Sequence, residues 1–232
     1  MKPFSRSVIE LFDGKKRYVI PMFQRQYVWR EDRQLGRMWE DLKARTEQRL
    51  DNKATSPHFL GAIVISLLPT FGRKVQAYDV VDGQQRLTTF QVLLNAFRDV
   101  ARALESEFAD ELSKYIVNEG IMEDKAVERY KVWPTQVDRP QMKALVDCGS
   151  QEGVEALEKA ELGKKKTGVE PIMITVPSAI STCEMTFDPA GRGRPCQRDS
   201  RQFTIMSRWT NSRTHASSSY HSHSVNDLYS LM

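Results

Sequence analysis

The clearest pattern of apolar and polar positions lies near the middle of the chain. Apolar residues recur there at steps of three and four, at Leu87, Phe90, Leu94, Phe97, Ala101 and Leu104. This spacing places them on one face of a helix of about five turns. The pattern therefore predicts a long amphipathic helix whose apolar face begins at Leu87.

Apolar segments before this helix predict strands. Residues 59–68 are apolar with few interruptions and predict a buried strand, and residues 75–81 predict a second strand. The Pro69 to Gly72 segment between them is typical of a turn, so the two strands are expected to form a hairpin. Residues 17–20 predict a further strand, which Pro21 ends.

Helix signals precede and follow the strands. Ser7 and Glu10 have the spacing of a capping box, which predicts a short helix through Phe12. Asp32 is a candidate N-cap for a second helix, whose apolar face is Leu35, Met38, Trp39 and Leu42. Weaker helical patterns cover residues 105–118, 123–130, 140–146 and 152–162.

The patterns divide the chain into three parts. Residues 1–105 are predicted to form the core and residues 106–163 a helical extension. Residues 164–232 are rich in serine and have no sustained period of either kind, so we interpret them as a low-complexity tail. Two alternatives remain open for this part: a disordered segment, or a shift of reading frame near residues 175–185.

The net charge of +4 gives little support to nucleic-acid binding by residues 1–163, because the excess positive charge lies outside them. Residues 1–163 hold 25 Lys and Arg against 25 Asp and Glu, so the whole excess belongs to residues 164–232. No bulk attraction to nucleic acid is expected, although a local patch remains possible.

Membrane, secreted and disulfide-stapled classes are disfavoured. No apolar stretch is long enough to cross a bilayer, and the first twelve residues lack the apolar block of a secretory signal. The three cysteines, Cys148, Cys183 and Cys196, are widely separated, which argues against a disulfide framework and a zinc site. A cytoplasmic setting is predicted.

The candidate chemistry lies where the second predicted strand meets the long helix, at Asp82-Gly83-Gln84-Gln85-Arg86. Gly83 lets the backbone approach a ligand closely, and the first helical turn presents free N–H groups with a partial positive charge. Arg86 adds a guanidinium suited to phosphate oxygens. Asp82 is expected to cap the helix in a box with Gln85, and to hold Mg²⁺ beside a ligand.

The same residues have plainer interpretations. An Asp-Gly pair before a helix is often only a turn and a cap, and Arg86 could pair with a surface carboxylate. Thr88 and Gln91 offer a competing capping box one turn later.

Other kinds of site are poorly supported. The chain lacks GxxxxGK[ST], the P-loop motif, and GxGxxG, the dinucleotide-binding motif. It has one histidine, His58, before residue 164, which disfavours a histidine-based hydrolase in that part.

Three segments resemble the N-terminal domain of GmrSD-type restriction endonucleases, in the order of that family. They are Ile20 to Trp29 with the FQR motif, Phe59 to Val64, and Val81 to Thr89 with the DGQQR motif. Trp133-Pro134-Thr135 resembles a further segment of the family. The resemblance covers residues from about 8 to 150.

The resemblance implies an α+β fold of the ParB/sulfiredoxin-like type, a small mixed sheet with packed helices. It also implies that the chain binds and hydrolyses a nucleoside triphosphate with Mg²⁺, coupled to cleavage of foreign, often modified, DNA. The residues implied in catalysis are Asp82, Gln85 and Arg86. Those implied in binding nucleotide phosphates are Arg25, Gly83, Gln84, Gln85, Arg86 and Thr88, with Asp82 as the Mg²⁺ ligand.

The chain departs from the family pattern after residue 163. Full-length relatives commonly continue to an HNH-type nuclease domain, and residues 164–232 do not resemble one. DNA is therefore expected to be reached directly or through a partner nuclease, and a homo-oligomer is open. Three hypotheses follow: an NTPase module of a phage-defence system, a catalytically idle DNA-binding or regulatory nucleotide switch, and a truncated non-functional remnant.

Overall fold

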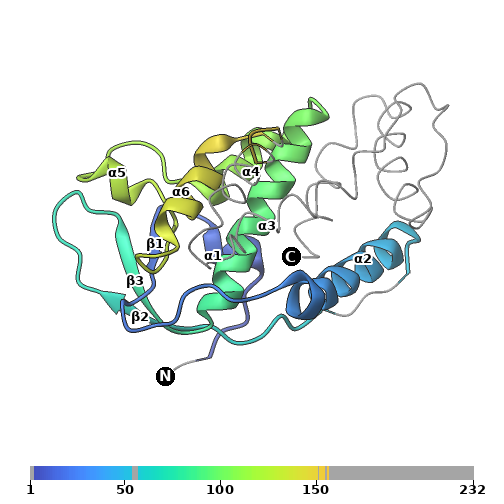
Figure 1. Ribbon diagram of the computed structural model, residues 1–232, viewed down its shortest axis with the longest axis horizontal. Helices are drawn as coiled ribbons and strands as arrows, with labels where there is room; N and C mark the ends of the chain where they lie inside the picture. The colour runs from blue at the N-terminus through green and yellow to red at the C-terminus, as the bar shows by residue number, and fades with distance from the viewer. Residues whose placement is uncertain (1–2, 54–56, 151, 155, 157–232) are drawn as a thin grey trace, which may run out of the picture.

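The computed structural model describes residues 3–53, 57–150, 152–154 and 156. They form a four-stranded mixed sheet in the order β2-β3-β1-β4, with helices packed against it (Figure 1). The strands are β1 (Lys16–Val19), β2 (Val64–Leu68), β3 (Gln76–Asp82) and β4 (Val132–Trp133). The helices are α1 (Val8–Phe12), the π-helical turn η1 (Glu31–Leu35), α2 (Gly36–Leu50), α3 (Gln84–Ala103), α4 (Phe108–Ile116), α5 (Lys125–Glu128) and α6 (Arg139–Cys148). The predicted α+β class with a small mixed sheet is confirmed.

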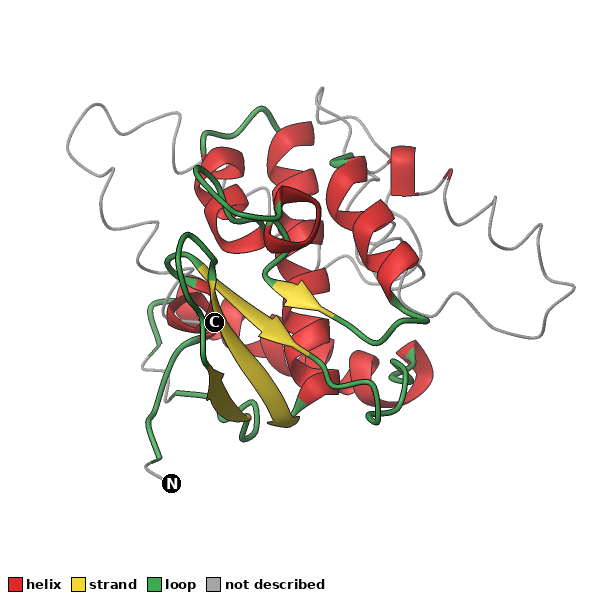
Figure 2. Ribbon diagram, turned by 90° about the vertical axis from the view of Figure 1, so that its left-hand side faces the viewer, coloured by secondary structure: helices red, strands yellow, loops and turns green. Residues whose placement is uncertain are grey.

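Strand β1 lies at the centre of the sheet. It pairs in parallel with β3 on one side and with β4 on the other, while β2 pairs with β3 antiparallel at the edge. The β2–β3 pair confirms the expected hairpin. Figure 2 shows the strands as one layer with helices above and behind it. Strand β4 comes from the part of the chain that the sequence assigns to the helical extension.

Helix α3 is the main apolar element, as predicted, but it is buried beyond the predicted face: Val92 lies outside the stripe, and Leu104 at the end of the stripe is 42% exposed. Leu87, Val92 and Leu94 are fully buried in it, and they share one core with Val80 of β3 and Val132 of β4. Burial of a large aliphatic side chain contributes about 1.5–3 kcal/mol, so the face of α3 that meets this core is a dominant source of stability.

The first helix also begins as expected. Ser7 accepts a hydrogen bond from the main-chain N–H of Glu10, and the Glu10 carboxylate accepts one from the Ser7 main chain at 2.7 Å, which completes the capping box. The expectation for Asp32 is wrong. Asp32 lies inside η1, and α2 begins four residues later at Gly36, so its carboxylate does not cap that helix.

The buried strand expected over residues 59–68 is also corrected. Only Val64–Leu68 forms a strand, and Phe59 is 81% exposed. The strand has one neighbour, β3, and Leu67 on it is 61% exposed. Residues 59–63 form a loop rather than a strand. The prediction failed because an apolar run in an edge strand and its preceding loop has the same sequence pattern as a buried central strand.

The weaker helical patterns correspond to α4, α5 and α6. Helices α4 and α5 are shorter than their predicted ranges, while α6 extends beyond its range at both ends. Residues 152–154 are helical and represent the start of the last predicted helix. The rest of that helix and the predicted low-complexity tail lie outside the described residues. Within the described part of the chain, no helix combines the length and apolar character needed to cross a bilayer.

Lys131 is a buried cation that ties β4 to the chain between α1 and β1. It is 2% exposed, and its Nζ donates to the carbonyls of Phe12 at 2.9 Å and Gly14 at 2.6 Å. Burial, together with the smaller effect of the Lys16 charge, lowers the pKa of Lys131 from 10.5 to about 8. The folded chain therefore releases this proton at a lower pH than the unfolded chain.

We expect the stability of the protein to rise with pH because of Lys131. Between about pH 8 and pH 10.5 the unfolded chain holds a proton that the folded chain has released, so the free energy of unfolding increases across this window. The expected rise is about 3 kcal/mol. Urea unfolding of the wild type and Lys131→Met at several pH values measures it, because other groups cancel in the difference. Equal pH slopes in the two proteins would contradict the expectation.

Candidate functional site

The site is built at the junction of β3 and α3. Asp82 is the last residue of β3, Gly83 occupies the N-cap of α3 with φ of +92°, and the helix begins at Gln84. No side chain caps this helix end. The predicted N-cap role of Asp82 is wrong, because the left-handed turn at Gly83 leaves Asp82 in the strand. The competing start at Thr88 is wrong as well, since α3 already includes that residue.

Gly83 also allows two chain segments to touch. A Cβ at this position would lie 3.0 Å from both the Ala62 carbonyl oxygen and Ile63 Cα. The loop before β2 therefore runs directly beside the start of α3. A side chain larger than hydrogen would push this loop away.

The two glutamines of the motif hold a third segment in place. The Gln84 amide donates to the Arg25 carbonyl at 3.0 Å. The Gln85 amide donates to the Gln26 carbonyl at 3.0 Å and accepts from the Val28 main-chain N–H at 2.8 Å. Both side chains are 7% exposed. In the structure these amides are engaged with the backbone of residues 25–28, which packs against the first turn of α3.

Arg86 lies between β3 and the loop before β2. Its Nη2 donates to the Ala62 carbonyl and to the Asp82 carboxylate, the latter at 3.3 Å. Gly61, with φ of +107°, makes room for it, because a Cβ there would lie 2.7 Å from Arg86 Cδ. Arg86 Nε is buried and has no partner among the described residues. Nη1 also forms no hydrogen bond among the described residues, and the side chain is 27% exposed, so this nitrogen offers donors to a ligand.

Further hydrogen bonds hold the segment of residues 25–28 in place, and the sequence did not predict them. The Tyr27 hydroxyl and Thr89 Oγ1 are 2.8 Å apart, and burial raises the pKa of the Tyr27 phenol. The Tyr27 main-chain N–H donates to Asp138 at 3.0 Å, and Thr135 donates to the same carboxylate oxygen at 2.7 Å. The partners lie 111 residues apart, so no local pattern could have indicated them.

All four segments that carry the family resemblance thus converge at one place. Arg25 and Asp82 are exposed there, Arg86 is partly exposed, and the Gln24 amide bonds the Val81 carbonyl at 3.1 Å. Thr88, expected to bind phosphate, is 2% exposed in the second turn of α3.

The fit to Mg²⁺ is limited to one carboxylate. The Asp82 side chain is 69% exposed, so it is open to a cation. Among the described residues there is no group of three or more His, Cys, Asp or Glu that could hold a metal ion. Mg²⁺ commonly binds one or two carboxylates together with substrate phosphates, and Asp82 suits only that arrangement.

Sequence comparison identifies the family. Residues 8–185 match the family described as GmrSD restriction endonuclease, N-terminal domain. The chain belongs to this family. The match confirms the resemblance indicated by the motifs. It also associates this GmrSD N-terminal domain with restriction systems. It also continues past Gly163 into the part of the chain interpreted as a tail. No curated protein has a significant match to the chain.

Proposed function

We propose that this GmrSD N-terminal domain binds a nucleoside triphosphate at the β3–α3 junction and hydrolyses it. The observation that carries the proposal is the position of Arg86. It lies in the first turn of α3, Asp82 and the Ala62 carbonyl hold its Nη2, and its Nη1 forms no hydrogen bond among the described residues while the side chain is 27% exposed. A phosphate oxygen is a strong acceptor for such a donor.

The start of α3 supports the same ligand. The first N–H groups of a helix have no partner within the helix, and this end carries a partial positive charge. Gly83 presents no side chain over these groups. Phosphates bind at such helix starts when a second cation is near, and Arg86 supplies that cation.

In this proposal the motif residues have distinct roles. Arg86 and the main chain of Gly83 to Arg86 contact phosphate, and the exposed Arg25 closes over it. Asp82 positions Mg²⁺ or the attacking water. Gln84 and Gln85 act by holding the Arg25 segment, since their amides already bond its backbone. Thr88 supports this turn from inside the fold. In the restriction system, DNA is contacted directly or through a partner nuclease.

One observation favours a second candidate function, a nucleotide switch without hydrolysis. Both polar atoms of the Gln85 amide are occupied by the backbone of Gln26 and Val28, so this side chain is not available to orient water in the present arrangement. Measuring both nucleotide binding and release of inorganic phosphate separates the two functions. Binding without phosphate release identifies the switch.

Arg86→Ala is expected to weaken nucleotide binding about tenfold to a hundredfold, because a charge-assisted hydrogen bond contributes about 1.5–3 kcal/mol. Titration calorimetry with GTP, ATP and CTP in the presence of Mg²⁺ measures the affinity. Arg73→Ala, an exposed arginine in the turn between β2 and β3, is the charge-matched control and should bind like the wild type.

Thermal unfolding gives an independent measure of the same binding. A nucleotide at a hundredfold its dissociation constant should stabilise the wild type by about 2.7 kcal/mol, and Arg86→Ala by less. Equal binding by Arg86→Ala and the wild type would refute the proposed site. No binding of any nucleotide by the wild type would refute the function itself.

A further inference from the structure

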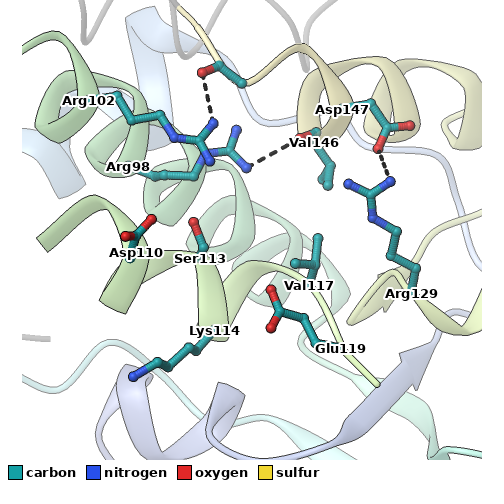
Figure 3. Close-up of a pocket in the computed structure, with 11 residues that line it drawn as sticks. Arg98, Arg102, Asp110, Ser113, Lys114, Val117, Glu119, Arg129, Val146 and Asp147 are labelled. Carbon is teal, nitrogen blue, oxygen red and sulfur yellow. Dashed lines mark hydrogen bonds and ion pairs between the residues drawn. The ribbon is translucent and has the colours of Figure 1, made fainter. Parts of the chain in front are cut away.

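A polar cavity lies at the end of α3 away from the β3–α3 junction, between that helix, α4 and the end of α6. It has a volume of about 440 Å³ and is lined by charged groups from all three helices (Figure 3). Arg86 and Arg98 are separated by about 18 Å along α3, at 1.5 Å per residue. The cavity is therefore distinct from the β3–α3 junction.

Arg98 is a buried group in this cavity that lacks a full set of hydrogen-bond partners. Its side chain is 4% exposed, its Nε donates to Asp99 at 2.8 Å, and its Nη1 donates to the Val146 carbonyl at 3.2 Å. Nη2 is buried and has no hydrogen-bond partner among the described residues. A buried guanidinium stays charged, and a donor without an acceptor is costly, so an acceptor supplied by a ligand would complete it.

Arg102 brings a second guanidinium to the same place. It follows Arg98 by one turn, and its Nη1 donates to the Gly149 carbonyl at 3.0 Å. Figure 3 shows the two guanidinium groups next to each other, both directed to the end of α6. Two such groups with remaining donors fit the several oxygens of a phosphate.

The other side of the cavity is mixed in charge: Lys114 is a cation in its lining, but its Nζ is paired with a carboxylate of its own helix. Asp110 and Glu119 are exposed carboxylates in its lining, and Ser113 Oγ donates to the Ala109 carbonyl at 2.8 Å, so it offers only lone pairs. The remaining carboxylate, Asp147, is already paired with Arg129 at 3.2 Å. These acceptors suit hydroxyl or amino groups rather than a second phosphate.

We propose that this cavity binds a small organic phosphate, with its phosphate on Arg98 and Arg102 and its hydroxyl or amino groups towards Asp110, Ser113 and Glu119. The cavity volume falls within the range of small-molecule sites. The alternative is that Arg98 and Arg102 serve only to cap the carbonyls at the end of α6.

Titration calorimetry of the full chain with ribose 5-phosphate tests the proposal, with inorganic phosphate and ribose as the two partial ligands. We expect ribose 5-phosphate to bind more tightly than either. Arg102→Gln should weaken binding about tenfold or more. Arg37→Gln, an exposed arginine on α2, is the control and should leave the affinity unchanged.

Ser113→Asp gives a second test that does not remove a cation. Its carboxylate would face the Arg98 and Arg102 guanidinium groups and repel phosphate, so binding should be lost while the protein remains folded. Absence of ribose 5-phosphate binding to the wild type, or equal affinity in Arg102→Gln and the wild type, would overturn the proposal. Binding of duplex DNA that depends on Arg102, without binding of the small phosphates, would also overturn it.

Repeating the titration with Arg86→Ala separates this cavity from the proposed nucleotide site, because that variant should retain ribose 5-phosphate binding.

Discussion

Gly83→Ala is expected to destabilise the protein by about 3 kcal/mol. A residue with a Cβ in the left-handed region costs about 1–2 kcal/mol, and φ at Gly83 is +92°. The added methyl also meets the main chain at Ala62 and Ile63, 3.0 Å away, and overpacking of this kind costs a further 1–3 kcal/mol or so. Urea unfolding of the variant measures the sum.

Gly14→Ala is the matched control for this substitution. Gly14 also has a positive φ, +72°, but a Cβ there would meet nothing within 4 Å. It should therefore show only the conformational cost of about 1–2 kcal/mol. Equal losses in the two variants would show that the contact between the loop before β2 and the start of α3 adds nothing.

Gln85→Leu is the second substitution with a large expected effect. It removes the amide that bonds the Gln26 carbonyl and the Val28 N–H, and it leaves these main-chain groups to find water or remain unpaired. We expect a loss of about 2–3 kcal/mol. Because the Arg25 segment is released, nucleotide affinity should fall as well, which calorimetry would detect in the folded variant.

Gln91→Leu is the control in the same helix. Gln91 is 1% exposed, and neither Nε2 nor Oε1 of its side chain has a partner among the described residues. Replacing it with leucine removes two unsatisfied groups, so stability should stay the same or increase. If Gln85→Leu were as stable as Gln91→Leu, the hydrogen bonds of Gln85 would have no net stabilising role.

The sequence predicted those parts of the fold that depend on local periodicity. The stripe from Leu87 to Leu104 identified α3, and the capping box at Ser7 and Glu10 identified α1, because both signals act within a few residues. Residues 59–63 were misassigned because apolar character alone does not distinguish a buried strand from a loop that packs beside a helix start.

The candidate site could be predicted in place but not in detail. The motif at residues 82–86 correctly indicated a strand-to-helix junction, yet the engagement of Gln84 and Gln85 with residues 25–28 depends on tertiary contacts 57–59 residues apart. The same holds for the cavity at Arg98, where α3, α4 and α6 meet only after folding. Sequence patterns report periodicity and residue type, and neither reveals which distant main-chain group a polar side chain will meet.

The central position of β1 has a consequence for the order of folding. The first strand to be synthesised has both of its partners, β3 and β4, in later parts of the chain, and β4 follows it by more than a hundred residues. Pairings of such long sequence separation form slowly, because a large loop must close before they stabilise the chain. During synthesis both edges of β1 are unpaired until β3 has been made. The sheet can be completed only after Trp133, the last residue of β4, has left the ribosome.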